Sequence, residues 1–85
     1  MNSIDIICKN IKRLSDVIEI TPDMYTLSLI APPFFLSAER LVYLMYFIEK
    51  EAEIIFEELD LVNGGFKTIN NINSCMSNYM EFDLK

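Results

Sequence analysis

The clearest pattern of apolar and polar positions lies between residues 36 and 56, where it predicts the central helix of the chain. Apolar side chains recur there at steps of three and four residues, within an arc of about 100° on a helical wheel. Ser37 precedes the run as an expected N-cap, and no glycine or proline interrupts it, so a helix is predicted from Ala38 to about Ala52. Its expected core stripe consists of Leu41, Leu44, Met45, Ile48, Ala52 and Ile55.

Three aromatic side chains of this helix fall outside the core stripe, namely Tyr43, Tyr46 and Phe47. They lie among the charged positions, with Arg40 and Lys50 on either side. Single exposed apolar residues are common on proteins, but an adjacent group with a charged rim is typical of a binding surface. We therefore predict that these five residues bind a partner. The alternatives are that the rings simply lie on the surface, or that the preceding loop covers them.

Residues 3–18 repeat the helical spacing and predict an amphipathic first helix, capped by Asn2 or Ser3. The next segment, residues 19–36, contains all three prolines of the chain and is predicted to be a long irregular connection. Its many apolar side chains indicate that it packs across the core. The expected stripe of the first helix consists of Ile4, Ile7, Ile11, Leu14 and Ile18, with Cys8 alongside.

Two further helical segments are predicted towards the C-terminus. Residues 56–62 carry apolar side chains at three-residue steps, which suits one or two helical turns ended by Asn63-Gly64-Gly65. Thr68 is the expected cap of a last helix. The buried stripe of that helix is expected to be Ile69, Ile72, Met76, Tyr79 and Met80. The predicted fold class is therefore all-α: one domain over residues 1–85, with three main helices, a short fourth helix and a long loop between helices one and two.

The charge of the chain argues against nucleic acid as a partner. Its 85 residues carry a formal net charge of −6, which would repel a phosphate backbone. The charge is also local, because residues 49–60 hold six acidic residues and one lysine. This stretch would steer a basic partner surface towards that end of the second helix; the alternative is a solvated acidic rim.

The chain lacks the residue types on which many small catalytic and metal sites depend. There is no histidine, and the two cysteines, Cys8 and Cys75, have no CxxC spacing. This excludes the usual zinc ligand sets and Cys–His nucleophiles, so neither a metal nor an enzymatic activity is expected. The cysteines are expected to be buried thiols in a reducing compartment. The chain has no signal-peptide pattern, and its longest apolar run, Leu41 to Ile48, is too short for a bilayer, so we expect a cytoplasmic protein without a membrane partner.

The order of these elements resembles the acyl carrier proteins. The shared features are a first helix, a long proline-containing loop, a second helix opening on serine, a short third helix, and a last helix preceded by Phe-x-Thr. The chain is more similar still to the acyl-carrier-related proteins of bacteriocin-type (RiPP) peptide maturation systems, and the resemblance covers nearly its whole length. The matching stretches are Ile20-Thr21-Pro22-Asp23, Ile48-Glu49-Lys50-Glu51, Phe66-Lys67-Thr68-Ile69, residues 36–44 and residues 62–72.

One departure from this family concerns its prosthetic group. In carrier proteins Asp-Ser-Leu opens helix two, and the serine carries 4'-phosphopantetheine, whose thiol holds the acyl group. The family's spacing, counted back from Ile48, places Ala38 at the serine position and Ser37 at the aspartate position. Shifting the register to restore Ser37 places Glu51 where the family has a buried aromatic residue, whereas the first register places Ala52 there. A buried unpaired carboxylate costs far more than an underfilled site.

Two functional hypotheses follow from the resemblance. In the first, the protein is a carrier-like adaptor without a cofactor, docking through helix two onto a peptide-modifying or carrier-dependent enzyme. In the second, Ser37 carries 4'-phosphopantetheine and the protein shuttles an acyl or aminoacyl thioester. A third interpretation, independent of the resemblance, is a helical self-association module.

Overall fold

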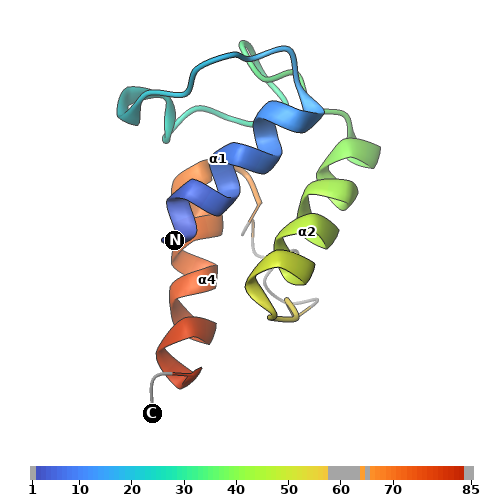
Figure 1. Ribbon diagram of the computed structural model, residues 1–85. Helices are drawn as coiled ribbons and strands as arrows, with labels where there is room; N and C mark the ends of the chain where they lie inside the picture. The colour runs from blue at the N-terminus through green and yellow to red at the C-terminus, as the bar shows by residue number, and fades with distance from the viewer. Residues whose placement is uncertain (1, 58–63, 65, 84–85) are drawn as a thin grey trace.

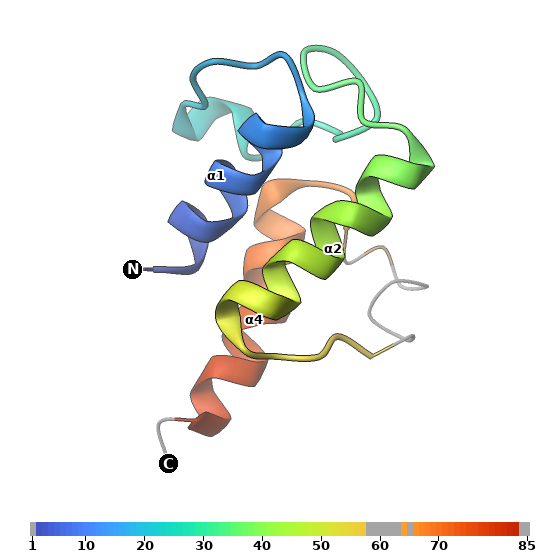
Figure 2. The ribbon, with the colours of Figure 1, turned by 45° about the vertical axis from the view of Figure 1, so that its right-hand side comes forward.

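All the regular secondary structure of the described residues is helical. The structure, a computed structural model, describes residues 2–57, 64 and 66–83, with side chains described as far as Tyr79. Within these residues there are three α-helices, one 3-10 turn and no strand, which confirms the all-helical prediction. The direction of α1 is opposite to that of α2 and α4, and the loop between α1 and α2 arches over one end of the bundle (Figures 1 and 2). The elements are α1 (Ser3–Leu14), η1 (Pro22–Met24), α2 (Ala38–Ala52) and α4 (Ile69–Asp83).

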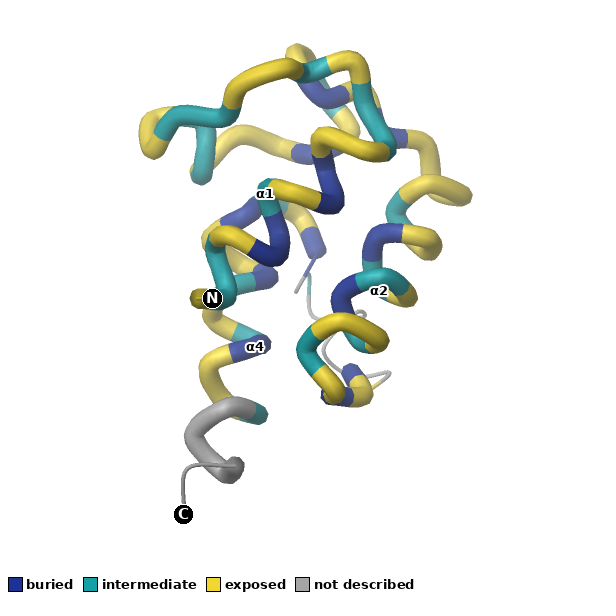
Figure 3. Tube along the Cα trace, viewed as in Figure 1, coloured by how far each residue is buried: buried dark blue, intermediate teal, exposed yellow. Residues whose placement is uncertain are grey.

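The core is centred on α1, which packs against both α2 and α4. Ile7 and Ile11 of α1 are completely buried, as are Leu44 and Ile48 of α2. The buried positions of the helices face the interior of the bundle (Figure 3). The buried apolar residues are Ile6, Ile7, Ile11, Leu29, Phe34, Leu36, Leu44, Ile48, Ile54, Phe56, Phe66, Ile69, Ile72 and Met76.

The first helix begins where the sequence predicts but ends earlier. The Asn2 side chain accepts a hydrogen bond from the backbone N–H of Asp5 at 2.9 Å, which confirms the predicted cap. At the other end, the Ser15 hydroxyl donates to the carbonyl of Ile11 at 2.8 Å. The same hydroxyl oxygen accepts from the backbone N–H of Val17 at 3.3 Å, and Ser15 has an extended backbone with φ −132° and ψ 174°. Because this local turn replaces the next helical bonds, the predicted extension to residue 18 is wrong, and Ile18 is 89% exposed instead of lying in the core stripe.

Backbone hydrogen bonds hold the long loop against the start of α4. The N–H of Leu29 donates to the carbonyl of Lys67 at 2.9 Å, and the N–H of Leu36 donates back to the carbonyl of Leu29 at 2.9 Å. Asn70 adds a bond from its N–H to the carbonyl of Tyr25 at 3.1 Å. The prediction that this loop packs across the core is confirmed by three buried side chains, Leu29, Phe34 and Leu36.

The second helix has the predicted bounds and ends in a left-handed turn. Glu53 has φ 57°, and the N–H of Ile54 donates to the carbonyl of Glu49 at 3.1 Å, as in a Schellman motif. The Glu49 carboxylate stabilises the turn further by accepting from the N–H of Phe56 at 2.8 Å. The turn carries Ile54 into the core and leaves Ile55 79% exposed. The assignment of Ile55 to the core stripe is therefore wrong, because the helix ends before it.

Aromatic packing fills the space between the end of α2 and α4. Phe56 packs edge-on against Phe66, with ring centroids 5.0 Å apart, and against Tyr79 at 5.8 Å. Of the helical turns predicted over residues 56–62, Phe56 and Glu57 are not helical, and residues 58–62 lie outside the described residues.

The last helix begins as predicted. The Thr68 hydroxyl oxygen accepts from the N–H of Asn71 at 3.1 Å, which confirms the cap. Gly64 has φ +82°, as expected of a glycine in the turn before this helix. The side chain of Met80 lies outside the described ones, but the rest of the predicted stripe packs inward, namely Ile69, Ile72, Met76 and Tyr79.

Candidate functional site

Ser37 lies on the surface at the start of α2, where its hydroxyl caps the helix. Its Oγ accepts from the backbone N–H of Arg40 at 3.2 Å, as the sequence predicts. The hydroxyl therefore has a local structural role, and it is also accessible from a neighbouring hollow. That hollow has a volume of about 420 Å³ and is lined by Arg13, Leu14, Ser37, Glu39, Arg40 and Tyr43.

Replacing Ser37 by alanine should lower the free energy of unfolding by about 0.5–2 kcal/mol, because α2 loses its N-cap. Urea denaturation at constant pH measures this loss. Ser74→Ala is a matched control, since Ser74 is an exposed position inside α4 where alanine is the better helix former. An unchanged midpoint for Ser37→Ala would mean that the hydroxyl does not stabilise the helix.

Two of the three aromatic side chains predicted to bind a partner are open to solvent. Tyr43 is 46% exposed and Tyr46 is 67% exposed, so the loop before α2 does not cover them. The hydroxyl of Tyr43 donates to the Glu39 carboxylate at 3.1 Å, one helical turn away. Phe47 is only half-buried, and its cover comes from α1 instead of the loop.

Arg13 of α1 also belongs to this surface, which the spacing of residues within the second helix does not predict. Its guanidinium carbon lies 5.7 Å from the centroid of the Phe47 ring, within the range of a cation–π contact. Arg13 lines both the hollow beside Ser37 and a second hollow of about 340 Å³ on α2. Its only sequence signal was a place on the polar side of the first helix. We define the α2 face as Arg13, Arg40, Tyr43, Tyr46, Phe47 and Lys50.

An ion pair beside the α2 face joins the first two helices. The Lys9 ammonium lies 2.7 Å from the Glu51 carboxylate. The hydrogen bond from Lys9 lowers the pKa of Glu51, and partial desolvation opposes that shift only in part. Next to the pair, Asn10 is completely buried and donates from Nδ2 to the carbonyl of Ile6 at 2.8 Å. The ion pair and the packing of α1 against α2 bring residues of both helices into one surface.

None of the cations of the α2 face forms an ion pair with a carboxylate in the described part of the chain. The ion pair between α1 and α2 is the only one among those residues. Arg13 donates weakly to the Asn10 side chain at 3.4 Å, and Arg40 donates to the backbone carbonyl of Leu14. Lys50 is exposed. The face therefore combines open aromatic rings with three cations, and the carboxylates of Glu39 and Glu51 belong to residues that line the same hollows.

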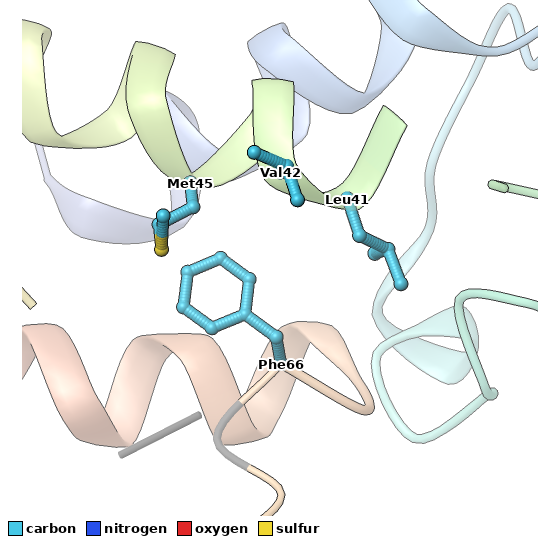
Figure 4. Close-up of a pocket in the computed structure, with 4 residues that line it drawn as sticks. All are labelled: Leu41, Val42, Met45 and Phe66. Carbon is cyan, nitrogen blue, oxygen red and sulfur yellow. The ribbon is translucent and has the colours of Figure 1, made fainter. Parts of the chain in front are cut away.

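A separate, wholly apolar hollow lies on another side of α2. It measures about 90 Å³ and is lined by Leu41, Val42, Met45 and Phe66. The Phe66 ring points from the segment before α4 towards the three α2 side chains (Figure 4). This hollow explains why Leu41 and Met45, both predicted to lie in the core stripe, are only partly buried.

The described residues offer few further candidates for a reactive group or a metal site. Cys8 and Cys75 are both thiols and are half-buried, where full burial was expected. Burial raises the pKa of the Cys8 thiol, which disfavours a nucleophilic thiolate. In the described ranges no cluster of three metal-ligating side chains occurs, and none of the helices there has the length and apolar character needed to span a bilayer.

Comparisons with protein-family models, with curated proteins and with solved structures find no match to this chain.

Proposed function

We propose that this chain is a carrier-protein-like adaptor that works without a prosthetic group and docks through α2 onto an enzyme of a peptide maturation pathway. The observation that carries the proposal is the α2 face, where Tyr43 and Tyr46 are open to solvent among charged side chains. Aromatic anchors within a charged rim are the usual anatomy of a protein-binding hot spot.

The arrangement of elements supports the carrier-like part of the proposal. A first helix, a long loop packed across the core, a second helix opening on Ser37 and a last helix preceded by Phe66-Lys67-Thr68 follow the order that the resemblance implies. Glu49, late in α2, stabilises the turn that leads into the next segment. These features support a carrier-like scaffold in which α2 is the exposed recognition helix.

Two observations support an adaptor without phosphopantetheine. Ala52 packs against the core while Glu51 lies on the surface paired with Lys9, which favours the register that puts Ala38 at the family's serine position. The Ser37 hydroxyl is already engaged as the N-cap of α2.

The second candidate function, a working carrier with 4'-phosphopantetheine on Ser37, is favoured by the accessibility of that residue. Ser37 is exposed and lines a hollow that Arg13 and Arg40 also line, together with Glu39. Under this alternative Ser37 would hold the group and the two arginines would lie close to its phosphate. The bound group would supply a thiol that carries an acyl or aminoacyl thioester.

The mass of the intact protein distinguishes the adaptor from the working carrier. The protein is incubated with a promiscuous phosphopantetheinyl transferase and coenzyme A, with an authentic carrier protein as positive control. We expect no gain of one phosphopantetheine, because Ala38 stands at the attachment position. Quantitative loading that Ser37→Ala abolishes would overturn the adaptor in favour of the carrier.

A further inference from the structure

Asn10 is the one polar side chain that is completely buried in the described part of the chain. Residues on either side of it in α1 contact α2. Lys9 pairs with Glu51 at 2.7 Å. Arg13, about one turn further along, lies over the ring of Phe47. Burying an amide costs free energy unless its polar atoms have hydrogen-bond partners, so the bonds of Asn10 should explain why an asparagine occupies this position.

The bond that Asn10 makes within α1 does not explain the asparagine. Its Nδ2 donates to the carbonyl of Ile6 at 2.8 Å, but that carbonyl is also the acceptor for the helical backbone N–H of residue 10. Asparagine is, in addition, a weaker helix former than leucine. A leucine would suit both the helix and the apolar core, so α1 by itself gives no reason for an amide here.

The Asn10 side chain also bonds to α2. The pKa of the Glu51 carboxyl is lowered, first by the hydrogen bond from Lys9, and a hydrogen bond from Asn10 adds to this shift. On its other side, the Oδ1 of Asn10 accepts from the Arg13 guanidinium at 3.4 Å. Asn10 therefore connects a carboxylate of α2 with the arginine through which α1 contributes to the α2 face.

The apolar contacts of α1 specify its position along α2 less well than this polar contact. Ile7 and Ile11 are both completely buried and lie about one helical turn apart, so a shift of α1 by one turn would place one isoleucine where the other had been. The same shift would separate the buried Asn10 amide from Glu51. A single buried asparagine fixes the register of coiled-coil helices for this reason.

We propose that Asn10 is a positioning residue, which sets the register of α1 against α2 and thereby places Arg13 over Phe47. This role goes beyond the proposed function and does not depend on it, because it concerns how the α2 face is built, whichever partner binds there. A substitution at this buried position would then disrupt the face without loss of stability.

Nuclear magnetic resonance of Asn10→Leu tests this role. The ring current of Phe47 should move the Arg13 side-chain protons upfield, and Phe47→Leu supplies their chemical shift without the ring. We expect Asn10→Leu to lose most of this upfield displacement. Its urea midpoint should be no lower than that of the wild type, because Arg13 and Glu51 are exposed and can bond to water instead. Retention of the displacement would overturn the proposal, whatever the midpoint.

Asn78→Leu is the matched control, since it makes the same substitution at an exposed position of α4. It should change neither the Arg13 chemical shifts nor the register of α1. If leucine is too large for position 10 and that variant does not fold, Asn10→Ala replaces it, because alanine removes the same polar atoms and adds no volume. Loss of the upfield displacement in the folded alanine variant would support the positioning role, and its retention would overturn it.

Two variants of Glu51 distinguish the register from the direct bond between Asn10 and Arg13. Glu51→Gln keeps an oxygen that can accept from Asn10, so the upfield displacement of Arg13 should be retained. Glu51→Leu has no such acceptor, so most of the displacement should be lost although Asn10 and Arg13 are unchanged. Retention in both variants would show that the contact with α2 does not set the register. Loss in both would assign the register to the ion pair with Lys9, and either result would contradict the proposal.

Discussion

Replacing Ile48 by alanine is expected to lower the free energy of unfolding by about 2–5 kcal/mol. Ile48 is completely buried in the centre of α2, and the packed side chains of α1 and α2 around it cannot collapse fully into the space that it leaves. Denaturant unfolding followed by far-UV circular dichroism measures the change.

Val42→Ala is the matched control for Ile48→Ala on the same helix. Val42 is 57% exposed, so its truncation should change the free energy of unfolding by no more than about 0.5 kcal/mol. Met45→Ala should fall between the two, because Met45 borders the apolar hollow and is only partly buried. Similar losses at positions 42 and 48 would contradict the packing of α2 described above.

Replacing Tyr43 and Tyr46 together by serine should weaken binding to the partner enzyme by at least about 2 kcal/mol, or roughly thirtyfold, and leave the thermal midpoint nearly unchanged. Both rings are exposed, so they contribute contact area to a partner and little to the core. Phe47 is left in place because Arg13 of α1 lies over its ring. Calorimetric titration and thermal unfolding of the same samples measure the two effects.

The control for the tyrosine variant is Ile18→Ser/Ile30→Ser, which removes two exposed apolar side chains of the loop. It should bind the enzyme as the wild type does. A tyrosine variant that unfolds several degrees earlier would show that the rings stabilise the fold, and any loss of binding would then be indirect.

The features that the sequence predicts correctly depend on local signals. Asn2, Ser37 and Thr68 each precede an amphipathic run, and each oxygen lies within reach of an N–H three residues later. The long loop can also be predicted from the sequence, because prolines at three positions prevent a regular helix there.

The incorrect predictions concern the ends of α1 and α2. These ends are determined by local hydrogen bonds or by an uncommon backbone conformation. At Ser15 the hydroxyl oxygen accepts from the N–H of Val17 and the backbone becomes extended, so α1 ends although the apolar period continues in the sequence. Glu53 adopts φ 57°, a conformation typical of glycine or asparagine, so no residue type marked the turn that exposes Ile55.

The sequence predicts only those parts of the candidate site that lie on a single helix. Exposure of Tyr43 and Tyr46 follows from the helical wheel. The placement of Arg13 over Phe47 depends on how α1 crosses α2, and the spacing within either helix does not specify that crossing. The exposure of Ile55, which lines a hollow together with Tyr46 and Lys50, results from a turn that no residue type signals.

Hydrogen–deuterium exchange tests docking through α2 most directly. The partner enzyme is captured from the native cells with the tagged chain, purified, and added in excess to the wild-type protein. If the protein docks through α2, we expect slower exchange in residues 40–50 of α2 and around Arg13 in α1, with the loop of residues 19–36 unchanged. Slower exchange confined to that loop or to α4, with α2 unaffected, would contradict it.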